Sequence, residues 1–123
     1  MVLRMASVTF DCRNARLVGS FWAAALGYTL GEDANEEVAI AEDPRDRDVE
    51  LVFVRVPEEK TVKNRVHLDL GTQDMEAEVA RLVGLGADRG ERIKGWTVMR
   101  DPEGNEFCVI QVPESDPIES WRT

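Results

Sequence analysis

Apolar and polar residues alternate with a period of two in two short strings of this chain. The first string covers residues 8–12 and the second covers residues 66–70. Such alternation predicts a half-buried β-strand, because successive side chains of a strand point to opposite faces. In the second string, His67 and Asp69 therefore share one face and the aliphatic residues share the other.

Each string opens the same succession of patterns, so the chain reads as one unit written twice. A polar turn follows the string, then an apolar stripe with helical spacing, and then a Leu-Gly pair at Leu26-Gly27 or Leu85-Gly86. Three more strand-like segments complete each copy. The pattern predicts an α+β fold of two tandem βαβββ modules, with curved mixed sheets around a cleft.

The boundaries of the predicted elements follow from turn and cap residues. Asn14 suits a helix N-cap, and Gly27 suits the left-handed position after a helix. The predicted strands cover residues 7–12, 28–31, 38–42, 49–56, 65–70, 89–94, 96–100 and 107–112, and the predicted helices cover residues 17–26 and 75–85. We expect a single domain over residues 1–123, with module one at about 5–57, a linker at 58–64, module two at 65–113 and a tail at 114–123.

Composition and charge narrow the function classes. The chain is 43% hydrophobic and 32% charged, as in an ordinary globular protein, and its net charge is −9. A nucleic-acid binder normally carries a basic patch, so we expect no nucleic-acid partner. No apolar stretch reaches the ~20 residues of a membrane span. We see no secretory signal and expect a cytoplasmic protein with reduced cysteines and no membrane partner.

His67, the single histidine, is the first candidate for chemistry. It would act as a proton-transfer group, contact a ligand, or form a structural hydrogen bond. A catalytic metal typically needs three protein ligands. The sequence offers His67 and Cys108, with Asp11, Asp69 or Glu106 in support. We predict no metal and no other cofactor.

Two aspartates occupy matched places in the two copies. Asp11 and Asp69 both lie on alternating strand positions, and two carboxylates in one cleft would have pKa values that are pushed apart, as acid–base catalysis requires. The alternative is that they pair with Lys63, Arg65 or Arg55 and hold the strand ends. The candidate catalytic residues are therefore His67, Asp69 and Asp11.

The candidate ligand-binding residues surround this histidine in the predicted fold. A cationic run just before it would hold an anionic group, or it is a solvated loop. Aromatic residues would form apolar walls, and a strand cysteine is a reactive thiol or a small hydrophobic residue. These candidates are Lys63, Asn64, Arg65, Trp96, Phe53 and Cys108.

Four motifs in fixed order carry a family resemblance. They are Phe-Trp-x-x-x-Leu-Gly at residues 21–27, His-Leu-Asp-Leu at 67–70, the helix end at 82–87 and Asp-Pro-Glu-Gly-Asn at 101–105. Over about residues 5–113 the chain resembles the vicinal oxygen chelate superfamily, which includes glyoxalase I, extradiol dioxygenases, and fosfomycin and bleomycin resistance proteins. Residues 60–70 look most like the actinobacterial glyoxalase-like domain group. The resemblance implies paired βαβββ modules, often in a homodimer.

The resemblance also implies where a metal would bind. Metal-using members take His, Gln or Glu ligands from the first, fourth, fifth and eighth strands. Those positions correspond here to Ser7 or Thr9, Glu50 or Arg55, His67, and Cys108. Only one ligand of the usual kind is clearly present, which argues against the usual metal site.

Four functional hypotheses follow. The first is a protein that binds a small molecule between the modules, and it includes a metal-independent lyase or isomerase. The second is a drug-sequestering protein of the bleomycin-resistance type. The third is a metal-dependent lyase, isomerase or dioxygenase with an atypical ligand set. The fourth is a non-catalytic interaction domain. Fold alone does not choose among them.

Overall fold

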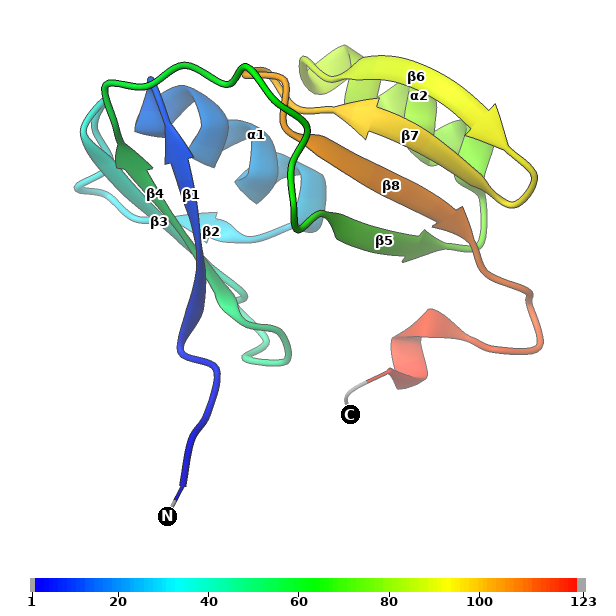
Figure 1. Cartoon of the computed structure of the whole chain (residues 1–123). Helices are drawn as coiled ribbons and strands as arrows, with labels where there is room; N and C mark the ends of the chain where they lie inside the picture. The colour runs from blue at the N-terminus through cyan, green and yellow to red at the C-terminus, as the bar shows by residue number, and fades with distance from the viewer. Residues whose placement is uncertain (1, 122–123) are drawn as a thin grey trace. The chain divides into compact units, whose positions relative to one another are not determined.

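The structure is a computed structural model that describes residues 2–121. The chain divides into two compact units, Met1–Glu59 and Lys60–Thr123. Each unit contains one α-helix and one four-stranded mixed sheet (Figure 1). The predicted α+β class and the two tandem modules are confirmed. No helix in the described part of the chain is long and apolar enough to cross a membrane.

Unit 1 has one parallel and two antiparallel strand pairs. Its elements are β1 (Ser7–Cys12), α1 (Ala15–Leu26), β2 (Thr29–Leu30), β3 (Val38–Glu42) and β4 (Glu50–Arg55). The strand order is β1-β4-β3-β2, and β1 runs parallel to β4. The Asn14 side chain accepts the Leu17 N–H at 3.1 Å and begins α1, and Gly27 ends it with φ of 69°.

The core of unit 1 lies between α1 and its sheet. Trp22 of α1 is 1% exposed, and Phe53 of β4 is fully buried. Gly19 lets the helix approach closely, because a Cβ atom there would lie 3.1 Å from Ala39 and 3.2 Å from Phe53. The ring of Phe10 is tilted against those of Trp22 and Phe53, with centroid separations of 5.3 Å and 5.1 Å. Aromatic packing therefore fills the space between helix and sheet.

Unit 2 repeats this topology. Its elements are β5 (Leu68–Thr72), α2 (Met75–Leu85), β6 (Asp88–Ile93), β7 (Trp96–Arg100), β8 (Glu106–Gln111) and a 3₁₀ turn η1 (Ile118–Ser120). The order is β5-β8-β7-β6, with β5 parallel to β8. The predicted tail begins after β8, and its last two residues lie outside the described residues.

The two faces of the unit 2 sheet differ in burial. Figure 1 shows α2 along one face, behind β6 and β7. The side chains of Thr97, Met99, Phe107 and Val109 are buried on strands β7 and β8. Thr97 donates to the Met75 sulfur of α2 at 3.5 Å, which marks this face as the one that α2 covers. The alternating residues therefore lie on the other face.

One predicted boundary near the candidate site is wrong. Strand β5 begins at Leu68, whose ladder partner is Phe107, and not at Arg65. The Asn64 N–H donates to the Glu106 carboxylate at 3.0 Å, so a side chain holds this segment in place of a strand partner. His67 consequently precedes the strand by one residue.

Candidate functional site

A pocket of about 450 Å³ opens on the unit 2 sheet, on the face opposite α2. Its floor is apolar and comes from alternate positions of β7 and β8. Its polar groups come from β5, from β8 and from the segment before β5. The lining residues are Lys63, His67, Asp69, Trp96, Val98, Glu106, Cys108 and Ile110.

Strand pairing places three of these side chains in a row. Asp69 of β5 pairs with Cys108 of β8, and Cys108 pairs with Val98 of β7. Directly opposite residues in a sheet carry their side chains on the same face about 5 Å apart. His67 lies two residues before Asp69 and lines the same pocket. His67 and Asp69 therefore face the same pocket, but not as residues of one strand, since β5 begins at Leu68.

A cluster of polar side chains lies at one side of the pocket. The Nε2 atom of His67 lies 3.2 Å from Oδ1 of Asp69. The sulfur of Cys108 lies within 4.8 Å of both residues' donor atoms. The side chains of His67 and Asp69 are 42% and 54% exposed, whereas Cys108 is buried. A ligand in the pocket would therefore reach the histidine and the carboxylate.

Cys108 is a neutral group in this cluster. Burial raises the pKa of its thiol, and the negative charge of Asp69 raises it further, although Lys63 opposes the effect. The thiol is thus protonated at neutral pH. This state differs from that of a thiolate nucleophile, which needs an electropositive surrounding.

Glu106 clamps the segment before β5 onto the sheet. It is 8% exposed, and its Oε1 lies 2.7 Å from Lys60 Nζ. Its Oε2 accepts the Asn64 N–H, and its backbone carbonyl accepts the Asn64 side chain at 3.4 Å. Burial raises the pKa of this carboxyl, but the bonds from Lys60 and Asn64 lower it more, to about 2. The anchored segment carries Lys63 and, just beyond, His67 to the pocket.

This clamp was not predicted from the sequence, in which Glu106 is a candidate only for a supporting metal ligand and Asn64 for a ligand-binding residue. The available signal was a glutamate that begins an apolar strand directly after the turn at residues 101–105, since a buried charge requires a partner. Asn64 serves the clamp through both its backbone and its side chain.

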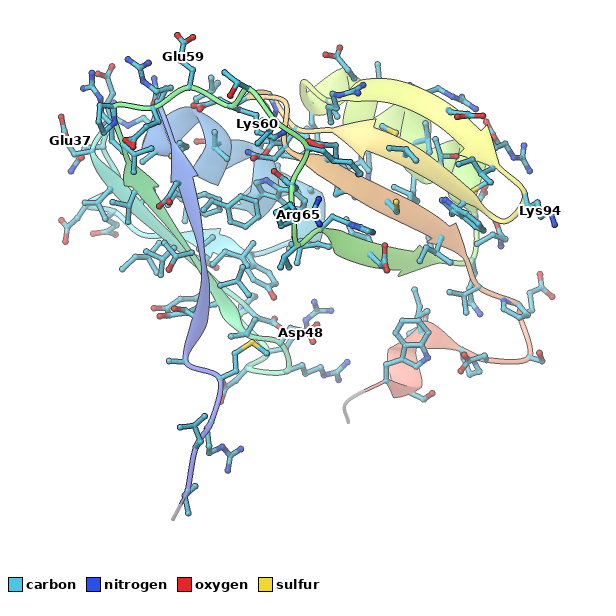
Figure 2. The ribbon with its side chains drawn as sticks, viewed as in Figure 1. Glu37, Asp48, Glu59, Lys60, Arg65 and Lys94 are labelled. Carbon is cyan, nitrogen blue, oxygen red and sulfur yellow. The ribbon has the colours of Figure 1, made fainter. Side chains whose placement is uncertain are left out.

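The cationic run divides into two environments. Lys63 lines the pocket, its side chain is 69% exposed, and its Nζ lies 4.0 Å from Glu106. Arg65 is exposed and does not line the pocket. Figure 2 shows Lys60 and Arg65 on the segment that leads into β5. A ligand-binding role for Arg65 stays a prediction.

Two predicted site residues belong to unit 1. The prediction that Phe53 forms a wall of the site is wrong, because Phe53 is fully buried in the core of unit 1 against α1. Asp11 is an exposed residue of β1. Its joint action with Asp69 stays a prediction. Trp96, in contrast, lines the pocket and is 38% exposed.

One set of side chains in the described residues has the donor types of a metal site. A nitrogen of His67, a carboxylate oxygen of Asp69 and the sulfur of Cys108 all lie within 4.8 Å of one another. Two of these residues occupy positions that the family resemblance assigned to metal ligands, and Asp69 is an addition. The absence of a cofactor, expected from sequence, stays a prediction.

Comparison with protein families gives a match across both units. The family described as glyoxalase-like domain matches residues 7–110. No curated protein matches the chain.

Solved structures similar to this chain share its fold. The fosfomycin resistance protein FosX from Mesorhizobium loti is 12% identical, with a TM-score of 0.69 over 94% of this chain and 96% of that one. A FosX mutant from Listeria monocytogenes, complexed with Mn(II) and 1S,2S-dihydroxypropylphosphonic acid, is 9% identical, with a TM-score of 0.68 over 98% and 99%. A glyoxalase/bleomycin resistance protein/dioxygenase family enzyme from Burkholderia phytofirmans is 16% identical, with a TM-score of 0.65 over 85% and 94%.

Proposed function

Because the chain belongs to the glyoxalase-like domain family of the vicinal oxygen chelate superfamily, we propose that it binds a small organic molecule in the pocket of unit 2. The observation that carries this proposal is the division of the pocket into an apolar floor and one polar cluster. Binding sites for small molecules are typically concave, mostly apolar and provided with a few convergent polar groups.

The apolar and polar residues of the pocket indicate which part of a ligand each side would contact. An apolar or aromatic portion would lie against Trp96, Val98 and Ile110, where it removes apolar surface from water. A polar portion would meet His67 and Asp69, which are both half-exposed. A ligand position between the two modules, as the sequence indicates, stays a prediction.

A ligand screen on chelator-treated, full-length protein tests the proposal. The screen contains three classes of compound: small phosphonates, neutral aromatic compounds, and cationic antibiotics such as bleomycin. The first and third classes represent the ligands of the similar resistance proteins. Thermal shift identifies compounds that stabilise the folded protein, and calorimetry measures their dissociation constants. A protein of the drug-sequestering type would bind a cationic antibiotic tightly without changing it chemically.

Variants show whether a hit binds in this pocket. We expect Trp96→Ala and His67→Ala each to weaken binding at least tenfold, or about 1.4 kcal/mol. Trp121→Ala is the matched control, because Trp121 is 37% exposed, similar to Trp96, and does not line the pocket. Equal affinity of the Trp96→Ala and wild-type proteins for every hit would refute the proposal.

Proton transfer is a second candidate function, favoured by the pair of His67 and Asp69. A carboxylate that accepts from one imidazole nitrogen fixes the ring orientation and the tautomer of a general base. Hits incubated with the protein in deuterium oxide would then exchange an acidic C–H for deuterium, seen by NMR. Exchange that persists in His67→Ala would assign it to another group.

A homodimer is part of the proposal and follows from the family resemblance. Light scattering on the full-length protein measures the mass in solution. A mass of one chain, 13.8 kDa, would contradict it.

A further inference from the structure

The donor atoms of His67, Asp69 and Cys108 are arranged by regular structure. Asp69 and Cys108 are ladder partners on β5 and β8, so the pairing of two strands fixes the separation of their side chains. His67 is held by the clamped segment that precedes β5. All three residues line the pocket, which gives an ion a route of entry and leaves solvent or ligand on its open side.

The separations of the donors suit a four-coordinate ion. With bond lengths of about 2.0–2.2 Å, tetrahedral coordination places nitrogen and oxygen donors roughly 3.3 Å apart. The His67 and Asp69 atoms lie 3.2 Å apart. The Cys108 sulfur is within 4.8 Å of both.

The donor types do not fit manganese, the ion found in the FosX complex from Listeria monocytogenes. Manganese(II) prefers oxygen ligands and stands at the weak end of the affinity order of divalent first-row metals. A sulfur, an imidazole nitrogen and one carboxylate oxygen match the ligands of zinc. The substitution of a thiol donor therefore changes which ion the pocket would select.

Neighbouring charge does not oppose a cation strongly. Lys63 is the one lysine or arginine among the lining residues. Its side chain is 69% exposed and faces the Glu106 carboxylate at 4.0 Å, so solvent and this partner screen it. Asp69 contributes a negative charge directly to the site.

Contrary to the expectation from sequence, we propose that His67, Asp69 and Cys108 bind a thiophilic divalent ion of the zinc type, with the fourth coordination position open to the pocket. Binding releases the thiol proton of Cys108 to solvent and requires the neutral imidazole to carry its proton on Nδ1 instead of on Nε2, the nitrogen that faces Asp69, so that the sulfur and Nε2 each supply an electron pair. This proposal concerns the same pocket as the proposed function but does not depend on it. The ligand screen is done on protein from which metal has been removed, so binding of an organic molecule and binding of an ion are measured separately.

Cobalt(II) titration tests the proposal, because cobalt occupies zinc sites and reports its ligands by absorption. The protein is full-length, untagged, and kept in a reductant that contains no thiol. We expect a thiolate-to-cobalt charge-transfer band in the near ultraviolet and intense visible bands typical of tetrahedral cobalt. One equivalent of zinc should abolish the bands, and excess Mn(II) should leave them unchanged.

Two variants separate the site from other cysteine chemistry. Cys108→Ser should abolish the charge-transfer band. Cys12→Ser is the matched control, because Cys12 is the other cysteine, is buried in unit 1 and donates to the Val54 carbonyl. It should retain the band. His67→Ala should remove the visible bands of tetrahedral cobalt. Because the His67 side chain is half-exposed, this substitution should disturb folding less than one at the buried Cys108.

The outcomes are decisive in either direction. Absence of a charge-transfer band in folded wild-type protein, its survival in Cys108→Ser, or displacement of cobalt by Mn(II) would each overturn the proposal. Binding of a small organic molecule by chelator-treated protein would stand in all of these cases. The two proposals therefore fail independently.

Discussion

At the scale of single residues, Glu106 determines how the pocket is built. Its buried carboxylate pairs with Lys60 and accepts the Asn64 N–H, and it lies two residues from Cys108 on β8. A buried charge without its partners is costly, so this carboxylate and its partners depend on one another. The polar cluster and the clamp share one strand, which links the stability of the segment to the shape of the site.

Glu106→Gln should destabilise unit 2 by about 1–3 kcal/mol, because it leaves Lys60 with a weaker partner while keeping the side-chain size. Urea denaturation of the full chain measures the change. Glu59→Gln is the control, since Glu59 is 76% exposed in its pair with Arg13, and an exposed pair contributes at most ~1 kcal/mol. An equal loss in both variants would show that the clamp contributes nothing beyond a surface ion pair.

Asp43 has a similar structural role in unit 1. Its carboxylate lies in the turn after β3, where it accepts the N–H groups of Arg45, Arg47 and Asp48. Burial raises the pKa of this carboxyl, but these bonds and the Arg45 side chain lower it more, so the net pKa lies below its ordinary value of 3.8. The charged form is therefore the one that the fold holds.

The Asp43 carboxylate should make stability depend on pH in a defined direction. Because its pKa is lower in the folded state, the unfolded chain binds more protons, and the stabilisation is present above pH 3.8 and lost as the pH falls through the folded pKa. Asp43→Asn removes this contribution. The free-energy difference between wild type and variant, measured by urea denaturation, should shrink on acidification; a constant difference would contradict the assignment.

At the scale of elements, local signals in the sequence located the helices and most strands. Asn14 and Gly27 mark the ends of α1, and both perform the capping expected of them. The strand at residues 38–42 and the strand at 96–100 were predicted with their exact bounds. These features depend on residues close in sequence, which is why they can be read from the pattern alone.

The start of β5 and the composition of the site depend on distant residues. Asn64 meets Glu106 across 42 positions, and no local period encodes that contact. From the sequence, Phe53 was a candidate for the wall of the binding site, because an aromatic residue in a strand can lie on either face of the sheet. Its burial against α1 is decided by the packing at Gly19. The pairing of Asp69 with Cys108 likewise required the order of the strands.

The cap of α1 offers a test at this scale. Asn14→Ala removes the acceptor for the Leu17 N–H and should cost about 1 kcal/mol. Asn14→Asp keeps a side-chain oxygen at that position and serves as the control, with stability within ~0.5 kcal/mol of wild type. Thermal and urea denaturation measure both. Equal destabilisation by the two variants would assign the role of Asn14 to something other than capping.

At the scale of the whole molecule, the two units share a topology but differ in chemistry. Both sheets have the order edge strand, parallel partner, and two antiparallel strands, with one helix each. Every residue that lines the described pocket belongs to unit 2. The repeat thus provides two scaffolds, and in the described residues the histidine–aspartate–cysteine cluster is found on the second.

This asymmetry predicts that stability and binding respond separately to a change in the core of unit 1. Phe53→Leu should destabilise the protein by about 1–3 kcal/mol, because a smaller side chain leaves space against α1. The affinity of the folded variant for cobalt, and for any hit of the ligand screen, should equal that of wild type. Calorimetry at a temperature where both proteins are folded measures this. A tenfold loss of affinity would show that Phe53 supports the site after all, as the sequence pattern first indicated.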